Sequence, residues 1–95
     1  MQSTLLYHIK RYFDDGSLQE IKIWSVPKSK DKPHGLKYSF AYIVSGERII
    51  CYDNAEGKND HKHIRNCETP YKFISVDKLW SGFMEDITRF REGEL

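Results

Sequence analysis

The chain has 95 residues, of which 31% are charged and 39% hydrophobic, with 6 Tyr, 5 Phe and 2 Trp. This length predicts a single domain over residues 1–95, and the aromatic content supplies apolar area for a small core, which excludes a disordered chain. A net charge of +1 excludes a uniformly basic nucleic-acid-binding protein, so any basic surface has to be local.

The sequence predicts neither a secretory signal peptide nor a membrane-spanning segment. The N-terminal stretch MQSTLLYHIKR lacks a basic region followed by an apolar run, which argues against a secretory signal peptide. No apolar run approaches the roughly 20 residues that a membrane-spanning helix needs. We therefore expect a cytoplasmic protein with no membrane contact, whose cysteines, Cys51 and Cys67, are reduced.

Two strands are predicted at the N-terminal end. Apolar and polar residues alternate with period two over residues 3–13 and again over residues 18–26. The stretch DDGS (14–17) between them is typical of a turn, so the two strands are expected to form a hairpin. The polar stretch PKSKDKPHG (27–35) that follows is predicted to be a loop.

A second hairpin follows this loop. The stretches KYSFAYIV (37–44) and ERIICY (47–52) are rich in aromatic and β-branched residues, as strands are. Ser45 and Gly46 between them are a two-residue turn signal. Further along the chain, TPYKFI (69–74) is expected to be extended, with its proline at an edge.

One amphipathic helix is predicted at the C-terminal end. Ser75 suits its N-cap, Asp77 complements the helix dipole in the first turn, and Gly93 marks the stop. Apolar residues recur at helical spacing at Val76, Leu79, Trp80, Phe83, Ile87 and Phe90. The expected fold is therefore α+β, with a four- to five-stranded antiparallel sheet built from hairpins and packed against this one C-terminal amphipathic helix.

The stretch YDNAEGKNDHKH (52–63) concentrates titratable side chains after the second hairpin. Histidine exchanges protons near neutral pH, so an HxH pair fits general acid–base catalysis. Metal-independent RNA cleavage needs a base, an acid and cations that stabilise charge developing on phosphorus. The sequence offers candidates for all three: His61 and His63 as acid and base, Asp53 or Asp60 to orient an imidazole, and Lys58, Lys62 and Arg65 as phosphate contacts.

Two other interpretations of this stretch stay open. His61 and His63, joined by Cys67, Cys51 or Asp53, could complete a metal site, but the spacing matches no strong zinc motif, and we expect no metal or cofactor. A polar loop is also often only solvated. Against this, about sixteen residues without secondary structure in a small domain are more often functional or mobile than filler.

Several motifs together point to a known family. They stand in KDKPHGLKYSFAYIVSGERIICYDNAEGKNDHKHI (30–64) and ETPYKFISVDKLWSGFMEDI (68–87), and PHxxKY, YDN…GK.DHKHI and E.PY.F are specific in combination. With these motifs the chain resembles the TumE-like proteins, small toxin components of bacterial toxin–antitoxin pairs. The resemblance covers nearly the whole chain. It departs at Gly82, where the family pattern has aspartate.

The resemblance implies a toxin that inhibits growth and is neutralised by a cognate antitoxin, commonly one with a helix-turn-helix DNA-binding part. By analogy with other small toxins built of sheet and helix, it also implies a metal-independent ribonuclease. Its catalytic residues would then be His61, His63, Lys58 and Asp53. The expected RNA contacts are Lys37, Lys62, Arg65, His34 and Tyr52, with Tyr52 or Tyr71 stacking on a base.

Two further functions remain open alongside the ribonuclease. The protein could be a non-enzymatic growth inhibitor or binding module that acts through the same basic loop, or a metal-dependent enzyme that uses His61, His63 and Asp53. An acidic antitoxin segment is expected to cover the two basic loops, Lys28–Lys37 and Lys58–Arg65. Whether the chain forms a homo-oligomer stays open.

Overall fold

The protein is described by a computed structural model that places residues 3–54 and 59–95. Within these residues it has one sheet of six strands and one helix. The elements in chain order are β1 (Thr4–Tyr12), β2 (Leu18–Ser25), β3 (Leu36–Val44), β4 (Glu47–Asp53), β5 (His61–Ile64), β6 (Cys67–Pro70) and α1 (Val76–Arg91).

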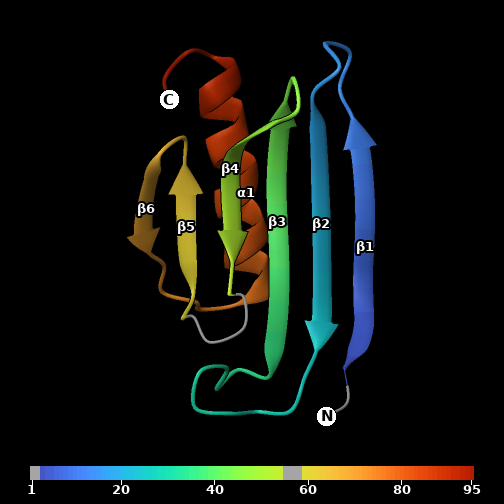
Figure 1. Cartoon of the computed structure of the whole chain (residues 1–95), viewed down its shortest axis with the longest axis vertical. Helices are drawn as coiled ribbons and strands as arrows, with labels where there is room; N and C mark the ends of the chain where they lie inside the picture. The colour runs from blue at the N-terminus through green and yellow to red at the C-terminus, as the bar shows by residue number, and fades with distance from the viewer. Residues whose placement is uncertain (1–2, 55–58) are drawn as a thin grey trace.

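The strands lie side by side in the order in which they occur along the chain, each antiparallel to the next (Figure 1). Short connections favour this arrangement, because antiparallel neighbours can be joined by tight hairpins. The β3–β4 turn is one of them: Ser45 and Gly46 have φ values of 52° and 79°, as its two-residue loop requires. The predicted α+β class with one C-terminal helix is confirmed.

The sheet has one strand more than the four or five that the sequence predicts. The additional strand is β5, whose residues HKHI carry no apolar alternation and therefore looked like loop. It pairs with β4 on one side and with β6 on the other. Strand β4 ends at Asp53, which pairs with His61, the first residue of β5. Strand β6 lies on the edge of the sheet and ends at Pro70.

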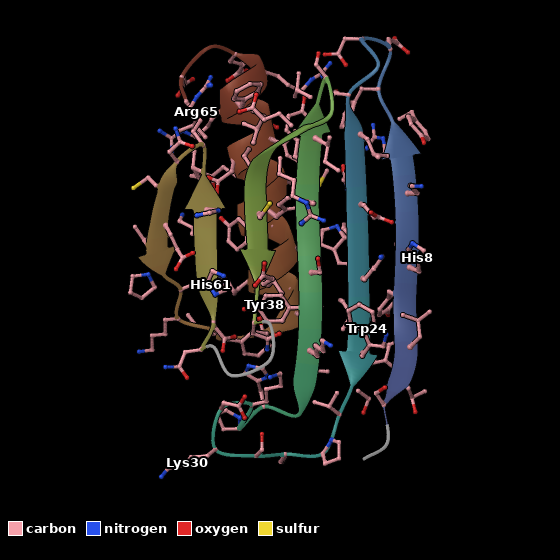
Figure 2. The ribbon with its side chains drawn as sticks, viewed as in Figure 1. His8, Trp24, Lys30, Tyr38, His61 and Arg65 are labelled. Atoms are coloured by element: carbon pink, nitrogen blue, oxygen red, sulfur yellow. The ribbon has the colours of Figure 1, made fainter. Side chains whose placement is uncertain are left out.

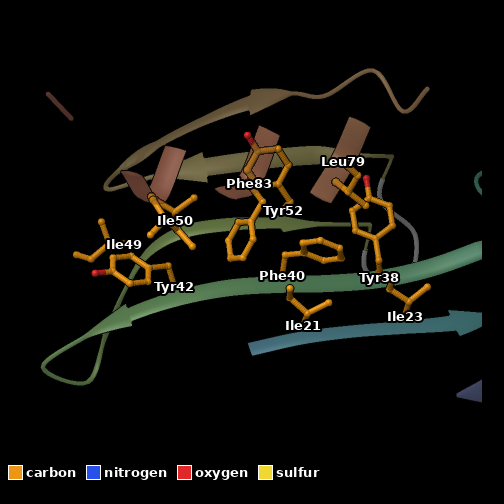
Figure 3. Packing of buried hydrophobic residues seen from close by; sticks show 11 residues of the cluster. Ile21, Ile23, Tyr38, Phe40, Tyr42, Ile49, Ile50, Tyr52, Leu79 and Phe83 are labelled. Atoms are coloured by element: carbon orange, nitrogen blue, oxygen red, sulfur yellow. The ribbon is translucent and has the colours of Figure 1, made fainter. Parts of the chain in front are cut away.

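The helix covers one face of the sheet, and the hydrophobic core lies between the two layers. Figure 1 shows α1 behind β3, β4 and β5. Rings from β3 and β4 meet the helix there: Phe40 lies edge-on to Phe83 with ring centroids 5.3 Å apart, and Tyr52 lies edge-on to Phe83 at 5.9 Å (Figure 3). The buried members of this core are Ile21, Ile23, Tyr38, Phe40, Tyr42, Ile49, Ile50, Tyr52, Leu79, Phe83 and Ile87.

Both ends of α1 use the chemistry that the sequence predicts. The hydroxyl of Ser75 accepts a hydrogen bond from the backbone N–H of Lys78 at 3.1 Å, which caps the N-terminus. Gly93 has a φ of 82° just past the last turn, a conformation that glycine adopts without strain. No helix within the described residues has the length and apolar character needed to cross a bilayer.

The other face of the sheet is turned away from α1, and we call it the open face. Figure 1 shows it toward the viewer, with none of the described elements in front of it. Side chains alternate between the two faces along every strand. The strand residues that alternate with the core residues therefore project from the open face, where they can meet another molecule.

Candidate functional site

The two strands that flank the stretch 54–60 bring a histidine and a carboxylate together on the open face. Asp53 is the last residue of β4, and it pairs in register with His61, the first residue of β5. The Nε2 atom of His61 lies 3.0 Å from Oδ1 of Asp53, and its side chain is only 14% exposed. The carboxylate of Asp53 therefore holds the imidazole of His61 in place on the open face.

The second ring nitrogen of His61 also has an acceptor beside it. Its Nδ1 atom lies 3.0 Å from the backbone carbonyl oxygen of Asn59. A carbonyl and a carboxylate only accept hydrogen bonds, so the protonated ring donates to both at once. This arrangement fixes the plane of the ring, with a carboxylate at Nε2 and, at Nδ1, a backbone carbonyl that a substrate oxygen would have to replace to receive a proton.

His63 lies two residues further along β5, on the same face as His61. Its Nε2 atom is 3.5 Å from Oε1 of Glu68 on β6, and its side chain is 44% exposed. Residues two apart on one strand are about 6–7 Å apart, so the two imidazoles are neighbours. Each therefore has a carboxylate partner, and Glu68 is a member of the site that sequence reasoning missed.

Lys62 lies between these histidines in sequence but on the helix side of the sheet. Its Nζ atom is 3.8 Å from Oδ2 of Asp86 and 5.5 Å from the centre of the Tyr52 ring. Tyr52 itself is 2% exposed and donates its hydroxyl hydrogen to Asp86. Burial, followed by this carboxylate, raises the pKa of Tyr52. The structure separates Lys62 and Tyr52 from the two histidines by the thickness of the sheet.

Arg65 is also placed apart from the histidine pair. It follows β5 at the end opposite His61, in the turn to β6, as Figure 2 shows. Its guanidinium lies 5.0 Å above the ring of Phe90 and donates to the carbonyl of Leu95 at 3.3 Å. Arg65 therefore holds the C-terminal end of the chain against the sheet.

His34 links the loop before β3 to the segment before β5 through Asp60. Whether these two basic loops lie together could not be predicted from the sequence. The Nε2 atom of His34 lies 3.0 Å from Oδ2 of Asp60, which also accepts a 2.7 Å hydrogen bond from the hydroxyl of Tyr38. Its Nδ1 atom accepts from the backbone N–H of Leu36 at 3.2 Å, so Nε2 carries the ring hydrogen. Both nitrogens of His34 are therefore engaged in structure, and Asp60 is fixed one residue before His61.

Lys37 lies on the open face, as a contact to a substrate there would require. It pairs with Trp24 of β2, and its Nζ atom is 5.4 Å from the centre of the indole ring. Figure 2 shows Trp24 and His61 on strands of the same sheet. Trp24 is a second residue that sequence reasoning missed, although the alternation of β2 places it on the opposite face from the buried Ile23.

A shallow pocket of about 350 Å³ is lined by His61 and by Glu68, the partner of His63. Its walls come from the segment before β5 and from β6: Asn59, Asp60, His61, Glu68, Thr69 and Pro70. Lys58, the remaining predicted catalytic residue, lies outside the described residues. Within residues 3–54 and 59–95, no three His, Cys, Asp or Glu side chains form a group that could hold a metal ion.

Comparison with known proteins identifies one family. A family model described as Toxin TumE matches residues 2–91, which is nearly the whole chain. No curated protein and no solved structure matches the sequence.

Proposed function

Because the chain belongs to the TumE toxin family, we propose that it poisons cells by cleaving RNA without a metal, at the His61–His63 pair on the open face. The family supports the toxin role and implies a cognate antitoxin. The observation that carries the ribonuclease proposal is the placement of His61 and His63 on one face, each within 3.5 Å of a carboxylate. We further propose that the antitoxin has a helix-turn-helix DNA-binding part.

The proposed reaction divides acid and base between the two histidines. His63, the more exposed ring, removes the proton from a ribose 2′-hydroxyl as the O2′–P bond forms. His61, aligned by Asp53 at Nε2, gives the proton on Nδ1 to the 5′-oxygen, which replaces the carbonyl of Asn59 there, as the P–O5′ bond breaks. The products are a 2′,3′-cyclic phosphate and a 5′-hydroxyl, and every proton is accounted for.

Positive charge near the scissile phosphate would come from Lys37 and from Lys58. Cations aimed at the phosphate lower the free energy of the transition state, because negative charge develops on its oxygens. Lys37 is on the open face beside Trp24, whose ring can stack on a base of a single strand. The role of Lys58 remains a prediction.

The test is to incubate the purified protein with RNA in EDTA and to follow strand cleavage. We expect the substitutions His61→Ala and His63→Ala each to slow cleavage by at least about a hundredfold, the lower range for a lost general acid or base. His8→Ala is the matched control, because His8 is also a sheet histidine paired with a carboxylate, Glu20 at 3.0 Å. It lies on β1, away from the proposed site, and should leave the rate unchanged.

Three results would contradict this proposal, and the last two would assign another function. Cleavage that is equally fast in both variants would remove His61 and His63 from the mechanism. RNA that stays intact while the expressed protein still arrests growth would favour the non-enzymatic binding module. Activity that is lost in EDTA and restored by an added divalent ion would favour a metal-dependent enzyme.

A further inference from the structure

Strand β1 is an edge of the sheet whose outer side is unoccupied by any strand of the described chain. All nine of its residues, Thr4–Tyr12, are exposed. An edge strand presents a row of unpaired backbone N–H and C=O groups, which readily pair with another extended chain. In Figure 1, β1 also lies beyond the part of the sheet that α1 covers.

The side chains of β1 are unusually apolar for an exposed edge. Of the six exposed large hydrophobic residues in the described chain, five lie on it: Leu5, Leu6, Tyr7, Ile9 and Tyr12, between 38% and 67% exposed. Tyr7 and Ile9 are on the helix side, where Tyr7 meets Trp80 edge-on at 6.0 Å. Tyr12 is on the open face opposite Leu18. Apolar residues on both faces are typical of a strand inside a sheet.

The charges on β1 indicate what kind of chain completes the sheet. His8, Lys10 and Arg11 are basic, and the strand contains no acidic residue. A second copy paired through β1 would bring two sets of these cations together without a carboxylate on either strand, which is unfavourable. Charged residues such as lysine on an edge strand often prevent association with other chains. A strand that is protected in this way would not also expose five large apolar side chains.

We propose that β1 is the docking strand for an extended segment of the cognate antitoxin that presents acidic and apolar residues on both faces, since Lys10 lies on the open face and Arg11 on the helix side. This segment adds to the sheet beside β1 by main-chain hydrogen bonds, its apolar side chains cover the exposed ones, and its carboxylates face Lys10 and Arg11. The inference rests on the partner that the family implies and not on RNA cleavage.

The test measures binding of the antitoxin, expressed from the neighbouring gene, to the full chain. The double variant Lys10→Glu/Arg11→Glu should raise Kd by at least about tenfold, since two attractive contacts become repulsive. Tyr12→Ser should raise it by roughly threefold to tenfold, because an apolar contact is lost. Tyr12 is 67% exposed, so this second variant leaves the core intact. Amide hydrogen exchange along β1 should slow markedly in the complex.

The matched control is Lys72→Glu/Lys78→Glu, which makes the same change of charge at two exposed positions between β6 and the first turn of α1, outside β1 and outside both basic loops. Its Kd should stay within about threefold of the wild-type value if β1 provides the docking strand. The proposal is overturned if this control weakens binding while the β1 variants do not, or if β1 amides exchange equally fast in the free and bound protein. It is also overturned if the protein alone forms a dimer that the Tyr12→Ser substitution dissociates. In that case β1 pairs with a second copy of the chain and not with the antitoxin. Binding is measured without RNA, so these outcomes are independent of the ribonuclease test.

Discussion

All four histidines of the chain lie within 3.5 Å of a carboxylate oxygen. A histidine–carboxylate pair is therefore not by itself a sign of catalysis in this protein. What distinguishes His61 and His63 is that they are neighbours on one face of β5, with His61 lining a pocket, whereas His34 holds two loops together. The sequence predicts the HxH pair and proposes Asp53 or Asp60 as the carboxylate that orients an imidazole, but it could not assign Asp53 to His61, Asp60 to His34 or Glu68 to His63, since these pairs depend on how the strands and loops meet.

The contact between Asp53 and His61 makes a first prediction. Replacing Asp53 by Asn preserves the size of the side chain but removes the charge that stabilises and aligns the imidazolium. We expect Asp53→Asn to slow RNA cleavage by at least about tenfold. Glu20→Gln, the same chemical change in the partner of His8, is the control and should have no effect. Equal rates for Asp53→Asn and the wild type would argue that His61 does not need this carboxylate.

Two buried tyrosines make a prediction for alkaline pH. Burial, followed by the carboxylates of Asp60 and Asp86, raises the pKa values of Tyr38 and Tyr52 above their ordinary range. A group whose pKa is raised on folding stabilises the fold below its unfolded pKa, here about 10, and this contribution is lost as the pH rises above it. The free energy of unfolding should therefore fall above about pH 10, by up to about 1.4 kcal/mol per pH unit for each tyrosine.

This alkaline loss can be measured by urea unfolding at a series of pH values, with tyrosinate absorbance as a second signal. Absorbance from Tyr38 and Tyr52 should rise together with unfolding, and Tyr52→Phe should make the dependence on pH less steep. A free energy of unfolding that is constant above about pH 10 would contradict the account.

At the scale of elements, the helix and the two long hairpins could be predicted because their signals are local. The Ser75 cap, the apolar stripe of α1 and the Ser45-Gly46 turn each depend on a few neighbouring residues. Strand β5 was missed because it has four residues and no apolar alternation, and only Thr69 and Pro70 of β6 fall within the stretch predicted to be extended. Strand β5 is held by pairing with β4 and β6, which a local pattern does not reveal.

Gly82 in the middle of α1 makes a prediction for this element. A Cβ atom built there would lie 3.7 Å from the hydroxyl oxygen of Tyr52, an ordinary contact distance, and the residue does not need a positive φ. We expect Gly82→Ala to raise the free energy of unfolding by about 1 kcal/mol, because alanine favours the helix. Thermal unfolding should then shift upward by roughly 4–8 °C. A lower melting temperature would show that the helix cannot accept a side chain at this position.

At the scale of the whole molecule, α1 covers only part of the sheet, and this leaves two surfaces free for different tasks. The open face carries the histidine pair, and the uncovered edge at β1 carries exposed apolar and basic residues. The two surfaces are separated by the width of the sheet (Figure 1). An antitoxin docked on β1 could therefore anchor itself there and reach the site with another segment.

A contact between the helix end and the first turn makes a prediction for the stability of the whole fold. Arg91 donates to Asp15 at 3.0 Å, and Asp15 also accepts from the hydroxyl and backbone N–H of Ser17. The bonds from Ser17, followed by the charge of Arg91, lower the pKa of Asp15. A lowered pKa stabilises the fold above the unfolded value of about 3.9, and this contribution is lost as the pH falls through the folded pKa.

Acid unfolding followed by circular dichroism tests this contact. Asp15→Asn should be less stable than the wild type at neutral pH, and the difference should shrink as the pH drops below about 4. A difference that is the same at both pH values would show that the charge of Asp15 contributes nothing.

The proposed function of the open face is RNA cleavage by proton transfer at His61 and His63. The most direct measurement compares two oligonucleotides in EDTA, one all-RNA and one with a 2′-deoxyribose at the cleavage position. The account predicts that only the RNA is cut, leaving a 2′,3′-cyclic phosphate and a 5′-hydroxyl, because the 2′-hydroxyl is the nucleophile. Cleavage of the deoxy-substituted strand at the same position, or products with 5′-phosphate ends, would contradict it.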